Sequence, residues 1–163
     1  MPEERSKARA RRDRAQGKSS STQAGEFVHE EIDHVRQGKH GARSAKQAIA
    51  IGLSKARRAG VDLPPPKRGS TSERTRKSAA RDSARGRAAP RKKPSRSRSR
   101  ATQKALKRES RSTASHAALA SHARQAATSR SSAARSASAR KAATNKRRAR
   151  RKSTASKAAN QRS

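Results

Sequence analysis

The sequence predicts a mostly disordered chain that carries one small all-α helical hairpin and a long basic low-complexity tail. The 163 residues include 45 Lys and Arg against 11 Asp and Glu, and only 28% of them are hydrophobic. Chains with this combination cannot bury enough apolar surface to offset the entropy of ordering. The large apolar residues also gather in one short region, between Phe27 and Leu63. A conventional core over the whole length is therefore not expected.

The chain divides into three predicted segments. Residues 1–20 form a basic disordered arm, residues 21–66 a helical hairpin module, and residues 67–163 a disordered tail rich in Arg, Lys, Ser and Ala. The charge follows this division, because residues 63–163 carry 31 Lys and Arg against three acidic residues, whereas residues 25–62 carry seven against five. Burial is expected in the middle of the chain and charge at its ends.

The first predicted helix spans about residues 23–37. Its apolar residues recur at helical spacing and form one stripe. Thr22 is the expected N-cap, because a hydroxyl before the first turn accepts a hydrogen bond from a free backbone amide. Gly38 follows the last position and is expected to take the left-handed conformation that often ends a helix. The stripe consists of Ala24, Val28, Ile32 and Val35.

The second predicted helix spans about residues 45–59 and has clearer boundaries. Ser44 and Gln47 have the spacing of a capping box just before the apolar run. Gly60 stands at the position where a left-handed residue ends a helix, and the three prolines at 64–66 forbid continuation. One face of this helix carries Ala45, Ile49, Leu53 and Ala56.

A hairpin of two such helices is small for an independent core. Domains of about 40 residues usually need a disulfide, a metal ion or oligomerisation, and this chain has no cysteine. Self-association or folding upon binding is therefore expected. The candidate residues for a homo-oligomer interface are Ile49, Leu53, Val28 and Ile32.

The segment STQAGEFVHEEIDHVRQGKHGARSAKQAIAIGLSKARRAGVDLPPP, within about residues 20–66, resembles a family of small basic bacterial proteins built around a domain of unknown function. In that family a capped helix similar to KQAIAIGLSKARRAG, residues 46–60, recurs before basic low-complexity sequence. The resemblance implies a bacterial origin and a helical module, and it brings no activity or binding residues. The tail is also similar in composition to the tails of linker histones and of bacterial histone-like proteins.

The basic tail is the strongest functional signal. Each Lys or Arg that neutralises a phosphate releases a condensed counterion, so affinity requires neither a shaped pocket nor a base sequence. Duplex DNA carries one charge per about 1.7 Å, so the 28 net charges of residues 63–163 match about 48 Å of duplex. The residues expected to contact phosphate are Arg91, Lys92, Lys93, Arg96, Arg98, Arg100, Lys146, Arg147, Arg148, Arg150, Arg151 and Lys152, with Lys46, Lys55, Arg57 and Arg58 as weaker candidates.

These observations predict a cytoplasmic, nucleoid-associated architectural protein that binds duplex DNA without sequence preference, neutralising and bridging it. An RNA-binding or ribosome-associated basic protein is the first alternative. Phe27 is the one aromatic residue, which argues against base stacking but leaves structured RNA open. A second alternative makes the hairpin a docking module for a protein and the tail a nucleic-acid tether. No membrane partner is expected, because the longest apolar run has six residues, 48–53, where a span needs about 20.

The sequence predicts no enzyme, no cofactor and no metal site. His29 and His34 differ by five positions, which puts them on different faces of a helix, and none of the five His residues has ligand spacing. Glu30, Glu31 and Asp33 are interpreted as part of a solvated acidic face. No glycine-rich phosphate loop and no nucleophile motif accompany them.

Overall fold

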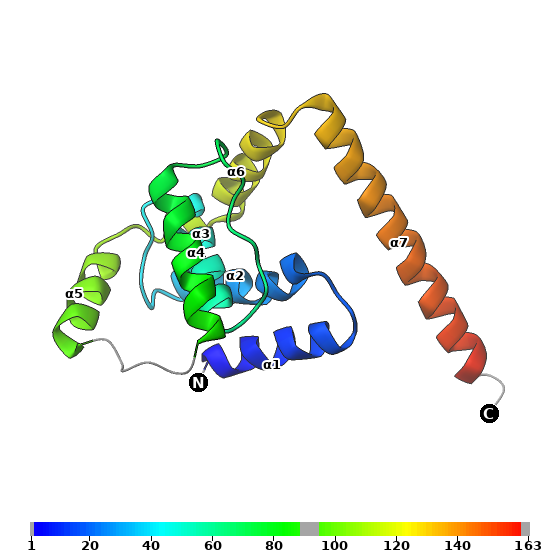
Figure 1. Ribbon diagram of the computed structural model, residues 1–163, viewed down its shortest axis with the longest axis horizontal. Helices are drawn as coiled ribbons and strands as arrows, with labels where there is room; N and C mark the ends of the chain where they lie inside the picture. Colours follow the sequence, from blue (N-terminus) through cyan, green and yellow to red (C-terminus); the bar gives the residue numbers. More distant parts are fainter. Residues whose placement is uncertain (1, 89–94, 161–163) are drawn as a thin grey trace. The chain divides into compact units, whose positions relative to one another are not determined.

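The computed structural model describes residues 2–88 and 95–160, with side chains described over 4–88 and 95–147. Within these ranges the protein is all helical (Figure 1). Its elements in chain order are α1 (Pro2–Ala15), α2 (Ser20–Arg36), α3 (Ala45–Arg58), α4 (Glu73–Arg87), α5 (Arg96–Lys107), the short 3-10 helix η1 (Ser112–Ala114), α6 (His116–Thr128) and α7 (Ser132–Asn160).

The prediction of a mostly disordered chain is therefore wrong. The expectation of disorder rested on the small number of large apolar side chains, but the core of this protein consists mainly of alanine. Eight of the eleven buried hydrophobic residues in the described part of the chain are Ala. Ala, Arg and Lys also have high helix propensity, so a chain rich in them forms helices without large apolar residues.

Helix α1 replaces the predicted disordered arm over residues 1–20. It packs along α2 (Figure 1), and its Ala10 is 5% exposed. Arg9 on α1 also forms an ion pair with Glu26 on α2, with 3.5 Å between Nη1 and Oε2. The N-terminal arm is thus part of the folded unit, because its small residues let two helices approach closely.

Helices α2 and α3 confirm the predicted hairpin, with one change of boundary. The N-cap of α2 is Ser19, whose Oγ accepts a hydrogen bond from the amide of Thr22 at 3.4 Å. The prediction of Thr22 as the N-cap is wrong by one turn, because the hydroxyl-rich run before the apolar stripe offers several capping residues. Gly38 ends α2 with a φ of 72°, as predicted.

The predicted ends of α3 are confirmed. The Ser44 Oγ accepts from the amide of Gln47 at 3.2 Å, whereas the Gln47 side chain accepts from the amide of Arg43 instead of closing the box on Ser44. At the other end Gly60 has a φ of 89°, and the amide of Val61 donates to the Ala56 carbonyl at 3.1 Å. These bonds satisfy carbonyls that the last turn of a helix leaves unpaired.

Helices α2 and α3 approach each other closely at Gly52. A Cβ atom placed on Gly52 would lie 2.6 Å from the Cα of Val28 and 3.0 Å from the carbonyl oxygen of Phe27. Both are backbone atoms of α2, so no rotation of a side chain relieves the contact. The crossing of the two helices therefore requires glycine at this position.

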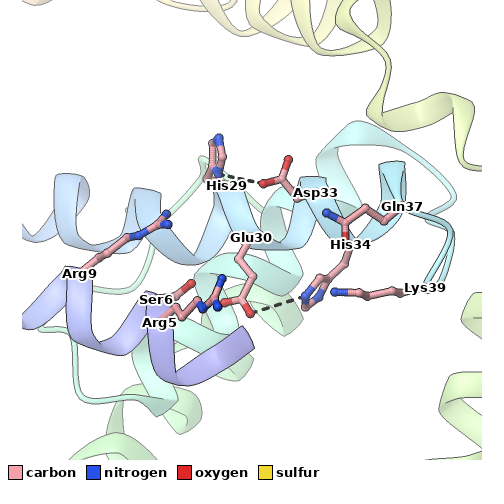
Figure 2. Close-up of a pocket in the computed structure, with 9 residues that line it drawn as sticks. All are labelled: Arg5, Ser6, Arg9, His29, Glu30, Asp33, His34, Gln37 and Lys39. Carbon is pink, nitrogen blue, oxygen red and sulfur yellow. Dashed lines mark ion pairs between the residues drawn. The ribbon is translucent and has the colours of Figure 1, made fainter. Parts of the chain in front are cut away.

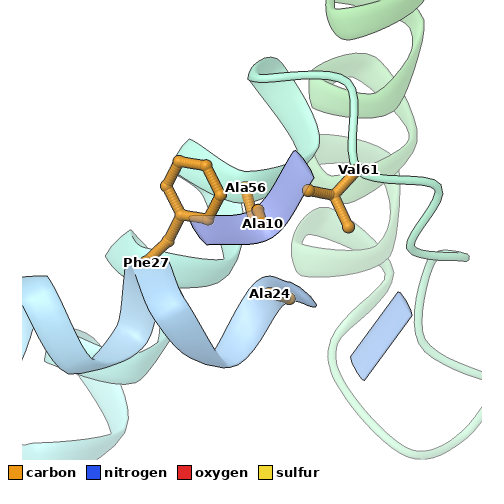
Figure 3. Close-up of a cluster of buried hydrophobic side chains, with 5 residues drawn as sticks. All are labelled: Ala10, Ala24, Phe27, Ala56 and Val61. Carbon is orange, nitrogen blue, oxygen red and sulfur yellow. The ribbon is translucent and has the colours of Figure 1, made fainter. Parts of the chain in front are cut away.

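The first core cluster forms where α1, α2 and α3 meet (Figure 3). Phe27 is 1% exposed and lies among small residues from all three helices. Leu53 and Leu63 pack against the cluster from its edge. Because a single large ring fills the space between alanines, this core depends strongly on Phe27. The cluster consists of Ala10, Ala24, Phe27, Ala56 and Val61.

The second core cluster includes a residue from far along the chain. Val35, Ala42 and Ala48 are fully buried together with Ala114, and Ile32 packs against them. Segment 106–114 docks on the α2–α3 loop through backbone bonds, since the amides of the loop residues 41 and 42 donate to carbonyls of residues 106 and 110. The packing around the hairpin therefore extends beyond residue 66, as far as Ala114.

Helix α4 packs along α3 (Figure 1) and extends the same folded unit. The Ser54 hydroxyl donates to the Asp82 carboxylate at 2.6 Å, and Ala79 is 6% exposed. With α1, α4 and segment 106–114 added, the hairpin no longer needs a second copy to complete its core. The homo-oligomer through Ile49, Leu53, Val28 and Ile32 stays a prediction, but the need to complete a small core no longer supports it.

The chain divides into two compact units, Met1–Ala120 and Ser121–Ser163. Helix α6 crosses this division. Helix α7 has 29 residues, and every side chain described in it is exposed. A helix that is polar on all sides has no face to bury in a core.

Candidate functional site

The tail residues predicted to contact phosphate fall into three groups. Arg96, Arg98 and Arg100 lie on α5 and are exposed, as are Lys146 and Arg147 on α7. Three others, Arg91, Lys92 and Lys93, lie outside the described residues. The last four lie on α7 beyond the range of described side chains, and these are Arg148, Arg150, Arg151 and Lys152.

The four weaker candidates on α3 separate in the structure. Lys46 and Arg58 are exposed. Arg57 is 7% exposed, and its guanidinium donates to the carbonyls of residues 63 and 64 at 3.3 Å. Lys55 lies 2.8 Å from a buried Glu31 oxygen. Arg57 and Lys55 hold the fold together, so we omit them from the candidate interface.

The most one-sided charge in the described part of the chain lies over residues 95–147. This segment contains fourteen Lys and Arg and one carboxylate, Glu109, and all fourteen basic side chains are exposed. Glu109 lies 3.7 Å from Arg43. Unbalanced, exposed positive charge attracts polyanions over long range.

The basic side chains of α7 point in several directions. At 100° per residue, Arg135 and Lys146 fall within about 20° of each other, whereas Arg140 and Arg147 lie about 120–140° away and Lys141 about 240° away. Such a helix presents charge all around its axis. Reading base edges requires side chains gathered on one face of a helix, and this helix has no such face. Its charges are placed for contact with phosphates alone.

The carboxylates of the folded unit are mostly engaged with bases of the same unit. Each acidic residue between positions 4 and 88 lies within 4.0 Å of a Lys, Arg or His nitrogen. Because Lys and Arg outnumber these carboxylates, some basic residues have no carboxylate left to pair with, and these mostly face solvent. The paired acids are Glu4, Asp13, Glu26, Glu30, Glu31, Asp33, Asp62, Glu73 and Asp82.

A second feature is a buried acid–histidine cluster where α2 meets the α2–α3 loop. Glu31 is 1% exposed, and its Oε1 lies 3.3 Å from the Nε2 of His40. Its Oε2 lies 2.8 Å from the Nζ of Lys55. The rings of His34 and His40 meet edge to face with 6.1 Å between their centroids. Ligand atoms of Glu31, His34 and His40 lie within 4.8 Å of one another.

His34 connects this cluster to a surface cleft of about 420 Å³ (Figure 2). Its Nε2 lies 3.6 Å from the Oε1 of Glu30, and both side chains are nearly buried. Burial lowers the pKa of His34 below its usual 6.5, and the charges of Lys39 and Lys55 lower it further. The cleft is lined by Arg5, Ser6, Arg9, His29, Glu30, Asp33, His34, Gln37 and Lys39.

Sequence reasoning missed this cluster for two reasons. The interpretation of Glu31 as part of a solvated acidic face is wrong, because Glu31 lies on the buried stripe with Phe27 and Val35, four positions from each. His40 belongs to the loop, where helical spacing gives no information. The sequence signal for it is an acidic residue, Glu31, with the apolar residues Phe27 and Val35 four positions before and after it.

Fold and charge together define an all-helical, strongly basic protein. Residues 17–68, which contain α2 and α3, match a family of unknown function, DUF6496. This match agrees with the expected domain of unknown function, and it leaves α1, α4 and all later helices outside it. No curated protein and no solved structure matches the chain. Among the described residues, no helix has the length and apolar character needed to cross a membrane.

Proposed function

We propose that this protein binds duplex DNA through phosphate contacts, without reading base sequence, and acts as a nucleoid-associated architectural protein. The observation that carries the proposal is the exposure of every basic side chain in residues 95–147, with fourteen Lys and Arg against one carboxylate. Phosphate contacts of this kind need charge and exposure, and these residues supply both.

The helical form of α7 changes how this surface meets DNA. At 1.5 Å per residue, its 29 residues span about 44 Å, close to thirteen base pairs of duplex. Because its charges point around the axis, one side can contact one duplex while another side faces a second. Bridging then follows from the distribution of charge on a helix, and it requires no long extended tail.

The types of exposed side chain favour duplex DNA over RNA as the ligand. Sequence-specific RNA and single-strand binding usually stack bases on aromatic rings, and the one aromatic residue, Phe27, is buried in the core. Arg and Lys on an exposed helix suit the regularly spaced phosphates of a duplex.

The proposal is tested by the salt dependence of binding to random-sequence duplex DNA and to structured RNA. In full-length protein, the triple change of Arg96, Arg98 and Arg100 to Gln should reduce the slope of log K against log salt by up to about 2.7, since each phosphate contact contributes about 0.9. Affinity should be the same, within a few fold, for duplexes of unrelated sequence.

A matched control removes three positive charges that are already paired. The change of Lys7, Arg76 and Arg87 to Gln alters net charge equally, but these side chains lie beside Glu4, Glu73 and Asp62. This control should change the slope much less than the α5 variant. Equal effects of the two variants would contradict a localised interface, and tighter binding of structured RNA would replace DNA by RNA in the proposal. Bridging is measured by co-sedimentation of two differently labelled duplexes.

A further inference from the structure

The acid–histidine cluster poses a chemical problem that the basic surface does not explain. The described buried atoms without a hydrogen-bond partner include both carboxylate oxygens of Glu30, the Oε1 of Glu31 and the Nε2 of His34, whereas the Oε2 of Glu31 is paired with the Lys55 ammonium at 2.8 Å. Buried polar atoms in folded proteins are nearly always hydrogen-bonded, and exceptions gathered at one place call for an explanation, such as an ion that binds there.

The orientation of His40 sharpens this problem. Its Nδ1 lies 3.0 Å from the carbonyl oxygen of Gly41. A carbonyl oxygen only accepts, so Nδ1 donates this bond and Nε2 points toward Glu31, 3.3 Å from Oε1. A lone pair on Nε2 facing a carboxylate oxygen is repulsive unless a cation lies between them, either a proton or a metal ion.

We propose that Glu31, His34 and His40 form a binding site for a divalent transition-metal ion of the zinc type. Two imidazoles and one carboxylate form a ligand set common for zinc, which binds N and O donors at about 2.0–2.2 Å in tetrahedral geometry. The edge of such a tetrahedron is about 3.3–3.6 Å, which agrees with the 3.3 Å from Glu31 Oε1 to His40 Nε2.

The surroundings of the three residues also suit a metal centre. Their ligand atoms already lie within 4.8 Å of one another, so small side-chain movements close the site. The bond from His40 Nδ1 to the Gly41 carbonyl fixes the ring, as a hydrogen bond from the second ring nitrogen does in metal-binding histidines. Glu30 lies beside His34 and can orient that ring or supply a further oxygen. Imidazole donors favour zinc, nickel or copper over magnesium or calcium.

Lys55 sets the affinity of the site. Its ammonium lies 2.8 Å from Glu31 Oε2, which leaves Oε1 directed at His40. The ammonium repels a divalent ion at the same carboxylate, so the site is weaker than its ligand set alone would make it. Removal of this charge should therefore strengthen metal binding, although the same change removes an ion pair from the metal-free protein.

A metal ion here would act as a structural link. Glu31 and His34 come from α2 and His40 from the loop on which segment 106–114 docks. A cysteine-free fold with a core made mainly of alanine has no covalent cross-link, and a bound ion would hold the loop against the helix.

The test uses full-length protein, freed of metal with a chelator, and Zn²⁺ or Co²⁺ as the probe. We expect one ion per chain, a visible absorption band of tetrahedral Co²⁺, and a rise in Tm of at least about 5 °C when Zn²⁺ is 100-fold above its Kd. Mg²⁺ should give no such rise. His34→Gln and His40→Gln should lose the band and the rise, whereas the control His29→Gln should keep both.

A second variant keeps the test decisive if the histidine variants unfold. Lys55→Gln should bind Zn²⁺ about tenfold more tightly than the wild-type protein. The proposal is overturned if Zn²⁺ gives no band and no rise in Tm, if His29→Gln loses as much as His40→Gln, or if Lys55→Gln binds no more tightly than wild type.

Discussion

Replacing Gly52 by Ala tests the close crossing of α2 and α3. The new methyl group would lie 2.6 Å from the Val28 Cα and 3.0 Å from the Val28 amide nitrogen. Both atoms belong to the backbone, so the two helices must separate to admit it. Overpacking of this kind typically costs about 1–3 kcal/mol. The higher helix propensity of Ala returns about 1 kcal/mol, so the net change is a loss of up to about 2 kcal/mol.

Gly25→Ala provides the matched control. Gly25 lies inside α2, and a Cβ atom there would meet nothing within 4 Å. This variant should gain about 1 kcal/mol from helix propensity alone. Since the propensity gain is common to both variants, the difference between them isolates the steric cost of the crossing, about 1–3 kcal/mol.

The assay is urea unfolding of the full-length protein, followed by circular dichroism. For a slope of about 2 kcal/mol per molar urea, the midpoints of the two variants should differ by about 0.5–1.5 M, with Gly25→Ala the higher. Equal midpoints, or a higher midpoint for Gly52→Ala, would show that α2 and α3 do not cross at Gly52 as the structure describes.

Three further predictions concern the core, the docked segment and pH. Phe27→Ala should cost about 3–5 kcal/mol, because the 1% exposed ring fills the space between small residues; a urea midpoint close to wild type would contradict this. Arg36→Gln removes the bond from its Nε to the Ala114 carbonyl, 2.9 Å long, and should speed proteolysis near residues 106–114, whereas Lys46→Gln, a change at another exposed basic residue, should not. With chelator present, stability should fall as the pH drops through 6.5, since burial lowers the pKa of His34 and the unfolded chain binds more protons there. His34→Gln should flatten this dependence more than His29→Gln, and equal slopes in urea unfolding would refute the assignment.

Capping chemistry made α2 and α3 predictable. Ser44, Gly38 and Gly60 act through bonds to amides and carbonyls a few residues away, so their spacing carries the information. The same locality explains the partial success at the start of α2, where a run of hydroxyl residues, 19–22, offered several caps and Ser19 was the one used.

The sequence was enough to predict that the candidate interface is basic, because net charge depends only on composition. The sequence assigned Lys55 and Arg57 to this interface as readily as Lys46, although the first two are held by partners inside the fold. Burial depends on which helices pack together, and helix–helix packing is not visible in the number of charges. The same limit hid the cluster of Glu31 and His40, which depends on where a loop returns to a helix.

By itself, the sequence determined the two central helices, their ends and the strong positive charge, since these depend on neighbouring residues and on counting. Tertiary structure alone decided that α1, α4 and segment 106–114 join those helices in one unit. Alanine is the physical reason: its small side chain contributes little to hydropathy, yet it allows helix backbones to approach closely and bury one another. Ala114, completely buried against Val35 although 79 positions separate them, shows how far along the chain this packing reaches.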